Sequence, residues 1–423
     1  MKHTTNKVYY RALQNIQDWG RPRKDFMKDR HHPQMYVDRM KFFLGLLGNP
    51  QHAYKVIHVT GTAGKGTVST MLQEVLISSG QRTGLYTSPY CVSAIENIRV
   101  DHLYISPTSV TSIVALLKPM IERARRSSYG VPSYFEIMTA VALLYFKKKN
   151  CDWVVLEAGL GGRYDATNVV DRPVVTAITS VGYDHTNVLG NTLQKIAHDK
   201  AGIIKDGSHF FTTVSDVKLL KIFQKICTQQ LAVFTSVRGS NKELVHRIGV
   251  FLKLPKAVIN KGIARTHLPC RLEAIDKRPT IILDGAHNEL KINYLFDRLK
   301  YIPKEKRIII FGIADDKNKK AILMRVAQET NQIVFTNFSF IGFPGRHCAD
   351  PKELSRIARS FSKNLDVTIS HTPLGALKKA RVLATRNSII IATGSFYLTG
   401  ELRKQWYPEE WILKHRSSFV PKH

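Results

Sequence analysis

The sequence has few cysteines and no long hydrophobic run. Its five cysteines include no C-x-x-C pair, and their number is odd. This pattern argues against a zinc site and a disulfide framework and suits a reducing compartment. No apolar run approaches the roughly 18 residues that a membrane span needs. The N-terminal stretch also lacks the apolar core and cleavage site of a secretory signal, so we expect a cytoplasmic protein without membrane attachment.

Acidic residues are scarce as well. Only 33 residues are Asp or Glu, against 63 Lys and Arg, which gives a formal net charge of +30. Such an excess attracts polyanions, including nucleic acids and anionic small molecules. The basic residues are scattered in short groups, however, and no aromatic-studded RNA-binding strand is recognisable. We interpret the charge first as a solvated basic surface, second as steering of an anionic substrate, and only third as a nucleic-acid function.

The chain is too long for one ordinary hydrophobic core, so we expect two or three domains. Apolar runs rich in β-branched residues predict strands in its first half at Lys55–Thr60, Trp153–Glu157, Val174–Thr179 and His209–Val214. Helical spacing predicts helices between them at Gly66–Ser79, Phe135–Lys148 and Leu193–Ile204. This alternation is typical of an α/β fold with a mostly parallel sheet and helices on both faces.

A second alternating series begins near Arg271. It predicts strands at Thr280–Leu283, Arg307–Phe311, Gln332–Thr336 and Ser388–Thr393. It predicts helices at Asn288–Leu299, Lys317–Thr330, Pro351–Ser362 and Leu374–Thr385. Gly262 and Pro269 interrupt the periodicity between the two series. We therefore predict a first domain over residues 1–268 and a smaller α/β domain over residues 269–423.

A glycine-rich turn, GTAGKGT, follows the first predicted strand. Glycines let backbone N–H groups approach a phosphate, and the N-terminus of the next helix adds partial positive charge. Lys65 would neutralise the β- and γ-phosphates, and Thr67 would place a hydroxyl near a metal. In the standard P-loop the lysine and the hydroxyl residue are adjacent, whereas here Gly66 separates them. The position of the turn directly after a predicted strand nevertheless favours nucleotide binding. The predicted nucleotide-binding residues of this turn are Thr60, Gly61, Thr62, Ala63, Gly64, Lys65, Gly66 and Thr67.

Eight segments of the chain, in order, resemble those of one enzyme family. They read VIHVTGTAGKGT, LYTSPY, YFEIMTAVALLYF, LEAGLGGRYDATNVV, ITSVGYDHTNVLGNTLQKIAHDKAGIIK, CRLEAI, ILDGAHN and ATGSFYLTGELR. The chain is thus similar to the folylpolyglutamate synthase/dihydrofolate synthase family of the Mur ligase superfamily. The resemblance implies a P-loop sheet domain of the Mur ligase central-domain type, followed by a smaller Rossmann-like domain. It also implies a monomer that uses ATP and Mg²⁺ to join L-glutamate to dihydropteroate or a folate through an acyl phosphate.

The resemblance further implies which residues bind the metal and carry the chemistry. The magnesium positions of the family match Ser88, Glu157 and His185, each of which follows a strand-like segment. Lys200 matches a lysine that reacts with carbon dioxide to form a carbamate, which then binds magnesium. That reaction needs a neutral amine and therefore a lowered pKa; direct contact with phosphate is the alternative. The predicted catalytic residues are Lys65, His185, Lys200 and His287.

The second domain and the folate pocket supply the remaining candidates. Arg271, Asp284 and His287 match positions that contact ATP or the reacting groups, so we expect this domain to close over the nucleotide. The predicted hinge is 268–270. Phe135 and Asp165 match the walls of the pterin pocket, although Phe135 on an apolar helix is equally consistent with a core residue. Ser395 is a further substrate candidate.

Several positions depart from the family pattern. They are Ala63 and Leu244 in place of asparagine, Tyr90 in place of histidine, Asn97 in place of arginine, and Cys270 in place of glycine. The adenine contacts and the acceptor are therefore open, whereas the phosphate and metal residues are all present. Two alternatives to a folate ligase remain: a Mur ligase relative that acts on another carboxylate, and a nucleic-acid-associated P-loop NTPase.

Overall fold

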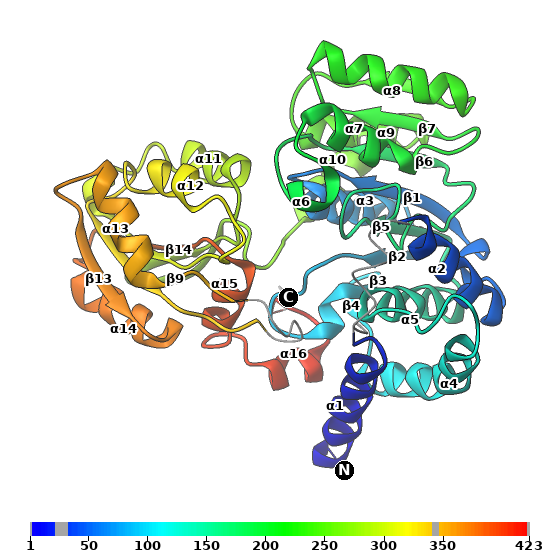
Figure 1. The fold of residues 1–423 in the computed structure, drawn as a ribbon, viewed down its shortest axis with the longest axis horizontal. Helices are drawn as coiled ribbons and strands as arrows, with labels where there is room; N and C mark the ends of the chain where they lie inside the picture. Colours follow the sequence, from blue (N-terminus) through cyan, green and yellow to red (C-terminus); the bar gives the residue numbers. More distant parts are fainter. Residues whose placement is uncertain (1, 22–32, 341–346, 421–423) are drawn as a thin grey trace. The chain divides into compact units, whose positions relative to one another are not determined.

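The computed structural model of the chain describes residues 2–21, 33–340 and 347–420 (Figure 1). The chain forms two compact units. The first comprises Met1–Tyr90 and Ala94–His267, and the second comprises Cys91–Ser93 and Leu268–His423. Both units are α/β with a mostly parallel sheet, which confirms the predicted fold class. The domain limits 1–268 and 269–423 stay a prediction.

An eight-stranded sheet organises the first unit. In spatial order its strands are β4 (Leu103–Tyr104), β3 (Ile98–Val100), β2 (Thr83–Tyr86), β5 (Trp153–Glu157), β1 (Lys55–Thr60), β6 (Val175–Ile178), β7 (His209–Thr212) and β8 (Val233–Ser236). The six strands from β2 to β8 in this order are parallel, and β3 and β4 add an antiparallel edge. The carboxyl ends of the parallel strands therefore meet at one edge, where open α/β sheets bind their ligands.

Helices cover both faces of this sheet (Figure 1). On one face, α3 (Lys65–Ser78), α9 (Asn241–Phe251) and α10 (Lys256–Arg265) share a core with β1, β5, β6 and β7. On the other face, Phe146 of α5 (Tyr134–Lys148) contacts Gly84 of β2. Helices α7 (Leu193–Lys200) and α8 (Val217–Gln229) pack there against Phe210 of β7. The other helices of this unit are α1 (Lys2–Trp19), α2 (Gln34–Leu46), α4 (Pro107–Arg125), α6 (Thr186–Leu189) and the 3₁₀ turns η2 (Pro50–His52), η3 (Ala94–Asn97) and η4 (Ala201–Ile203).

Gly262 has a packing role that the sequence did not reveal. It lies inside α10 and does not end an element, so the expectation that it interrupts the periodicity is wrong. A Cβ at this position would lie 2.5 Å from the Cα of Val75 on α3. The missing side chain therefore lets α10 pack closely on the helix that begins at the glycine-rich loop.

A six-stranded sheet organises the second unit. Its spatial order is β13 (Asp366–Ser370), β12 (Gln332–Thr336), β11 (Arg307–Phe311), β14 (Ile389–Thr393), β10 (Thr280–Leu283) and β9 (Glu273–Lys277), and only β9 is antiparallel to its neighbour. Helices α11 (Glu289–Arg298), α12 (Lys319–Val326) and α13 (Pro351–Phe361) share a core with one face. Helix α14 (Pro373–Leu383) packs on β11, β12 and β13, and α15 (Phe396–Arg403) on β14. The turn η5 (Lys304–Lys306) and α16 (Glu409–His415) complete this unit.

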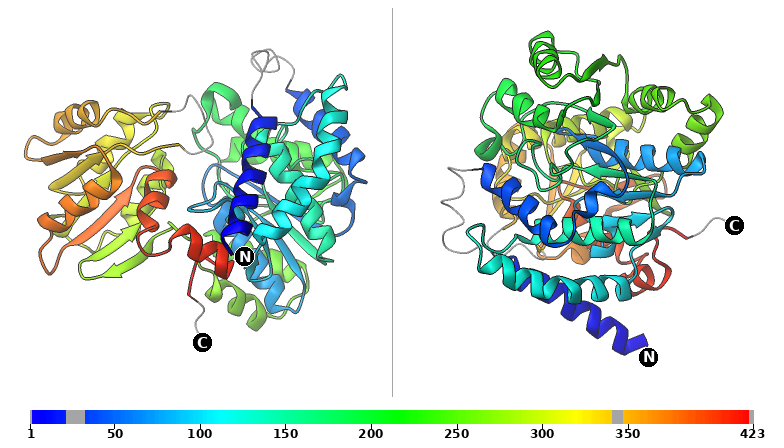
Figure 2. Two further views of the ribbon diagram at one scale, coloured as in Figure 1. Left: turned by 90° about the horizontal axis from the view of Figure 1, so that it is seen from below. Right: turned by 90° about the vertical axis from the view of Figure 1, so that its right-hand side faces the viewer.

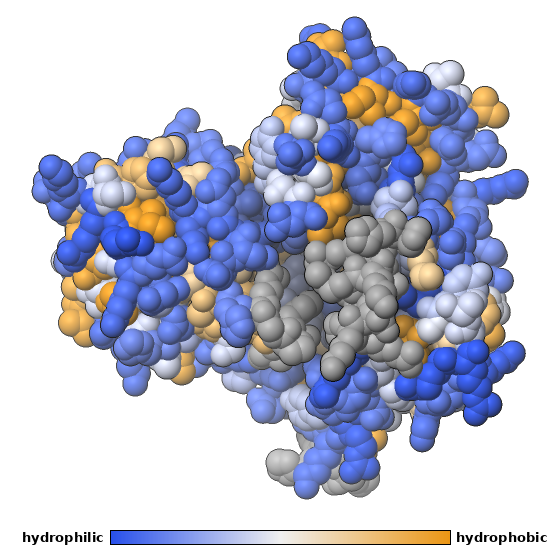
Figure 3. All heavy atoms as spheres, in the orientation of Figure 1, coloured by the Kyte–Doolittle hydropathy of each residue, from blue (hydrophilic) through white to orange (hydrophobic). Residues whose placement is uncertain are grey.

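The surface agrees with the polar composition. Figure 2 shows the helices around each sheet from two further directions. Hydrophilic residues dominate the face drawn in Figure 3, where hydrophobic residues form small scattered groups. Among the described residues, no helix combines the length and the apolar character that crossing a membrane requires.

Candidate active site

The glycine-rich loop joins β1 to α3 at the carboxyl edge of the first sheet. Strand β1 ends at Thr60 and α3 begins at Lys65, with Gly64 as its N-cap. Gly64 has φ 84°, a left-handed conformation that glycine adopts without strain. A Cβ at Gly61 would lie 2.0 Å from Thr179 Oγ1. The two glycines therefore allow a tight turn whose N–H groups and helix N-terminus suit a phosphate.

The segment after β6 holds this loop in place. The N–H of Thr62 donates to the Ser180 carbonyl (2.9 Å), and the N–H of Ala63 donates to Ser180 Oγ (2.8 Å). The Thr179 hydroxyl donates to the Ala63 carbonyl (2.6 Å). The peptide groups of Ala63 are thus fixed although its side chain has no amide. Sequence reasoning missed Thr179 and Ser180, which lie in the quoted segment ITSVGYDH.

The side chains next to the loop are also defined. Lys65 Nζ donates to the Gly61 carbonyl at 2.9 Å, so the ammonium group lies over the turn. A Cβ at Gly64 would lie 2.5 Å from Asn241 Nδ2, which places an amide against the loop. Leu244, one turn further along α9, is fully buried in the core and offers no polar group.

Glu157 brings two predicted metal positions together. It ends β5, is buried, and its Oε2 accepts the N–H of Ser88 at 3.1 Å. A Cβ at Gly66 would lie only 3.3 Å from the same oxygen. The carboxylate therefore lies between the start of α3 and the segment that carries Ser88.

His185 is placed near another carboxylate. It precedes α6 in a left-handed conformation (φ 51°), and its Nε2 lies 3.8 Å from Asp184 Oδ1. In the described part of the chain, no three His, Cys, Asp or Glu side chains are grouped closely enough to hold a metal ion. Magnesium, however, often takes one or two carboxylates and completes its shell with waters and substrate phosphates. The Glu157 carboxylate beside the start of α3 fits that mode of binding, and Ser88 adjoins it through its N–H.

Lys200, the last residue of α7, is almost fully buried and lies near the charges of Lys65 and Asp184. Burial lowers the pKa of its ammonium group from 10.5 to about 7, and the positive charge of Lys65 adds to this effect. Asp199, Asp184 and Asp165 oppose the shift. A substantial fraction of neutral amine is therefore present near neutral pH, as carbamate formation requires.

Asp165 is a buried carboxylate with an ordered set of donors. Its Oδ2 accepts the N–H of Leu160 (2.8 Å), and its Oδ1 accepts the N–H (2.9 Å) and the hydroxyl (2.6 Å) of Thr167. Burial nevertheless raises the pKa of Asp165. Thr167 Oγ1 also lies 2.8 Å from Nε2 of His58; because the hydroxyl proton goes to Asp165, His58 is the donor in this contact.

His58 was not among the predicted site residues. It lies on β1, two residues before the loop, and burial lowers its pKa to about 3, with a smaller effect from the charge of Lys205. His58 is therefore a neutral hydrogen-bond donor that orients Thr167. The sequence signal was a lone histidine within an apolar strand.

Phe135 forms an aromatic pair near the glycines after β5. Its ring lies 5.9 Å from that of Tyr86, and a Cβ at Gly159 would lie 2.5 Å from its Cζ. Phe135 keeps partial exposure, unlike the core residues that follow it on α5. Phe135 and Asp165 thus both contact the segment that follows β5, at Gly159 and Leu160 respectively.

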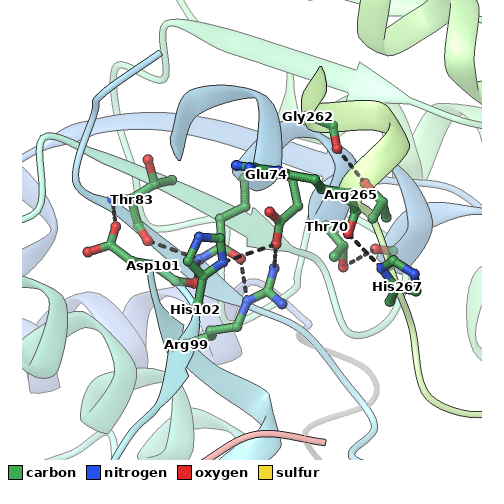
Figure 4. A network of polar contacts seen from close by, with 12 residues as sticks. Thr70, Glu74, Thr83, Arg99, Asp101, His102, Gly262, Arg265 and His267 are labelled. Atoms are coloured by element: carbon green, nitrogen blue, oxygen red, sulfur yellow. Dashed lines mark hydrogen bonds and ion pairs between the residues drawn. The ribbon is translucent and has the colours of Figure 1, made fainter. Parts of the chain in front are cut away.

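A polar network fixes α3 to the edge of the sheet (Figure 4). Arg99 Nη2 donates to Glu74 Oε1 at 3.1 Å, and Arg99 also bonds Gln73. Gln73 Nε2 donates to the carbonyls of Thr83 (3.0 Å) and Asp101 (3.1 Å). The family pattern has an arginine at the position of Asn97. Arg99, two residues later, does not replace it, because its guanidinium pairs with Glu74 of α3. The network therefore anchors the helix that follows the loop.

The second unit has its own group of predicted site residues. Asp284 directly follows β10 and accepts the N–H groups of Leu272 and Ala286, both at 2.9 Å. Burial raises the pKa of this carboxyl, and the nearby charge of Arg271 opposes the rise. The Arg271 guanidinium lies 4.5 Å from the centre of the Phe396 ring. Arg271 and Asp284 thus lie close together at this edge of the sheet.

His287 and Ser395 lie at the starts of two helices of this unit. Nδ1 of His287 lies 3.0 Å from the Gly285 carbonyl and is therefore a donor, which leaves Nε2 to accept from Lys291 Nζ at 3.1 Å. Lys291 was not predicted; its only signal was its place one turn after the histidine. The Ser395 hydroxyl accepts the N–H of Tyr397 at 3.2 Å and caps α15.

Comparison with known proteins relates these sites to one family. The Mur ligase middle domain matches residues 59–251, and the C-terminal domain of dihydrofolate synthetase matches residues 270–405. A dihydrofolate synthase/folylpolyglutamate synthase of Bacillus subtilis is 32% identical over 87% of this chain and 94% of its own. The chain belongs to the folylpolyglutamate synthase/dihydrofolate synthase family.

Solved structures of this family share the fold. The folylpolyglutamate synthase of Mycobacterium tuberculosis, complexed with ADP and AMPPCP, is 25% identical with a TM-score of 0.79, covering 88% of this chain and 95% of its own. A bifunctional folylpolyglutamate synthase/dihydrofolate synthase with Mn, AMPPNP and L-glutamate bound is 25% identical with a TM-score of 0.76, covering 87% and 93%. The resemblance inferred from the sequence motifs is therefore confirmed at the level of family and fold.

Proposed function

We propose that this chain joins L-glutamate to dihydropteroate, to a reduced folate, or to both, with ATP converted to ADP and phosphate. The observation that carries the proposal is the grouping of Lys65, Glu157 and Ser88 around a glycine-rich loop in a member of this ligase family. The substrate carboxylate would attack the γ-phosphate, and the amine of glutamate would capture the acyl phosphate. The known relatives bind adenine nucleotides, and one binds Mn and L-glutamate.

The residues of the first unit suit this reaction by position and charge. The N–H groups of Thr62 and Ala63 already donate to Ser180, so the N–H groups at the α3 N-terminus would hold the phosphates. Lys65 would leave the Gly61 carbonyl to neutralise them. A bound Mg²⁺ would supply further neutralisation of charge beside Glu157 and Ser88. Asp165 would accept N–H groups of the pterin ring beside Phe135. We further propose that Lys200 carries a carbamate, and that the enzyme is a cytoplasmic monomer.

Phosphate release tests the activity and its acceptor. The assay contains ATP, Mg²⁺ and L-glutamate, with dihydropteroate in one series and tetrahydrofolate in the other. We expect release that depends on glutamate with at least one acceptor. Lys65→Ala should lower turnover by about 10²-fold or more, because a cation that stabilises developing phosphate charge is lost. Exposed Lys118 on α4 offers the control Lys118→Ala, which should keep the wild-type rate.

Two results would contradict the proposal. One is ATP hydrolysis that proceeds equally without glutamate and without either pteroate acceptor. The other is a Lys65→Ala variant with the turnover of Lys118→Ala. Release stimulated by another amino acid, with no response to glutamate, would instead indicate a Mur ligase relative with a different substrate.

A further inference from the structure

Two cysteines that lie far apart in the sequence meet in the second unit. Sγ of Cys91 and Sγ of Cys270 are 2.7 Å apart, although 179 positions separate the two residues. Cys91 is 8% exposed and Cys270 is fully buried. Cys91 belongs to the segment Cys91–Ser93, which is part of the second unit although the chain on both sides of it belongs to the first. Sequence spacing could not reveal this pair.

The surroundings of the pair are polar and charged, although they are buried. The N–H of Cys270 donates to Glu273 Oε2 at 2.8 Å, and Glu273 pairs with the fully buried guanidinium of Arg403. Burial by itself lowers the pKa of Arg403, but the hydrogen bond and charge of Glu273, followed by the charges of Cys91 and Cys270, raise it above its usual value. Among the described residues, Arg403 Nη1 has no hydrogen-bond partner. The two thiols thus lie beside a buried ion pair whose guanidinium keeps one unused donor.

The other cysteines lack these features. Burial raises the pKa of Cys151 and of Cys227 to about 12, which keeps both thiols protonated and unreactive. Cys348 is only partly buried, and its thiol donates to Asn337 Oδ1 at 3.6 Å. Cys91 and Cys270 are the pair of cysteines whose sulfur atoms the structure brings into contact.

We propose that Cys91 and Cys270 form a reversible oxidation site, at which hydrogen peroxide converts the two thiols into an intramolecular disulfide. The Cys91 thiolate attacks one peroxide oxygen, the O–O bond breaks, and the departing hydroxide takes a proton to become water. The Cys270 thiol then attacks the resulting sulfenic sulfur, the S–O bond breaks, and a second water leaves. In sum, two thiols and one peroxide give one disulfide and two waters.

The disulfide would join two segments that lie close in sequence to predicted site residues. Cys91 follows Ser88 by three positions, and Cys270 directly precedes Arg271. Oxidation would therefore covalently fix Cys91–Ser93 to the segment from which Arg271 extends over Phe396. A thiol reductant would reverse the link by thiol–disulfide exchange. The proposal concerns this pair alone and does not depend on the ligase activity.

Thiol counting with peptide mapping tests the proposal on the whole chain. Of five thiols in the reduced protein, the link removes two, so three should remain after peroxide and five should return after dithiothreitol. The tryptic map should contain one linked pair of peptides, with Cys91 and Cys270. The control Cys348→Ser has four thiols and should fall to two with the same linked pair. Because the closed loop is long, the oxidised protein should also melt several degrees above the reduced protein.

Cysteine variants and the dose of peroxide decide whether the proposed disulfide forms. Cys91→Ser and Cys270→Ser should each lose the linked peptides and the dependence of Tm on oxidation. Should either variant fail to fold, the peptide map of the wild-type chain alone still decides. Separate alkylation of Cys91 and Cys270 at a peroxide dose that has already oxidised Cys348 would overturn the proposal. A map that links either residue to Cys151 or Cys227 would overturn it as well.

Discussion

Lys200 shows how one buried side chain depends on its surroundings. In the folded chain, burial and the charge of Lys65 lower its pKa from 10.5 to about 7. Because the folded-state pKa lies below the unfolded value, the buried ammonium costs stability, and this cost is full below about pH 7. The cost disappears as pH rises toward 10.5, where the unfolded chain also loses the proton. The same shift makes a neutral, nucleophilic amine available near neutral pH.

We therefore predict a carbamate on Lys200 that depends on pH. With ¹³C-bicarbonate, a carbamate NMR signal should appear and should grow between about pH 6 and pH 8, as the neutral amine fraction rises. Lys200→Met should lack this signal. Lys205 is a matched control, since burial also lowers its pKa; Lys205→Met should keep the signal of Lys200. A wild-type protein without any carbamate signal at pH 8 would show that Lys200 acts unmodified.

At this scale the sequence was informative about residues within motifs but not about their partners. The motif positions predicted Lys65, Glu157 and Asp165. The structure places Lys65 at the start of α3, Glu157 at the end of β5 and Asp165 in the segment that follows β5. A chain of hydrogen bonds runs from His58 through Thr167 to Asp165. His58 and Thr167 are 109 positions apart, so no local sequence pattern predicts their contact. Such contacts depend on which strands become neighbours, and the spacing of one segment does not contain that information.

At the scale of elements, a buried ion pair joins α2 to α5. Nη2 of Arg39 donates to Glu136 Oε2 at 2.9 Å, and both side chains are nearly fully buried. Glu136 also accepts the N–H of Ser133 at 2.6 Å, so the same carboxylate caps α5. The pair therefore fixes the start of the helix on which Phe135 lies. Breaking it would leave a carboxylate without its charge partner in the interior.

Urea unfolding of variants measures this contribution. Arg39→Met should lower the free energy of unfolding by about 3–5 kcal/mol, because the charge of Glu136 stays buried. The double variant Arg39→Met/Glu136→Gln should recover part of the loss, since glutamine removes the charge and can still accept from Ser133. The exposed pair Arg125–Glu122, 3.3 Å apart, supplies the control. Arg125→Met should change stability by less than about 1 kcal/mol.

A loss in Arg39→Met no larger than in Arg125→Met would contradict this role. A double variant as unstable as Arg39→Met would show that packing, not the uncompensated charge, causes the loss. Either result would weaken the argument that the pair positions Phe135. The two singles and the double variant together separate these contributions.

The strands were predictable because they are buried on both faces. Thr280–Leu283, Arg307–Phe311 and Gln332–Thr336 were predicted with the bounds that the structure shows. Strand β9, with the sequence EAIDK, is partly exposed and was missed because it has no apolar run. Gly262 was misread because glycine inside a helix resembles a helix end until the neighbouring helix is known. Local pattern reveals burial, whereas close helix contacts depend on the tertiary fold.

At the scale of the whole molecule, the net charge of +30 bears on how the protein captures anionic substrates. In the candidate site, the charges of Asp165 and Asp184 are opposed locally by those of Lys65 and Lys200. ATP and polyglutamylated folates carry several negative charges. A positive field raises their local concentration and their association rate, and salt screens this field over about 10 Å at 0.1 M. Steering therefore predicts an effect on substrate capture and not on the chemical step.

We predict that KM for ATP and for the anionic acceptor rises a few-fold between roughly 50 and 300 mM KCl, with kcat nearly constant. Steady-state phosphate release at several salt concentrations measures both quantities. A zwitterion such as glycine betaine at equal osmolality is the control, because it adds solute without screening. KM values that do not respond to KCl would leave the basic surface with a solvating role only. Hydrolysis stimulated by RNA or DNA, with a steep salt dependence and no need for glutamate, would instead favour a nucleic-acid partner, because release of counterions from a polyanion produces that dependence.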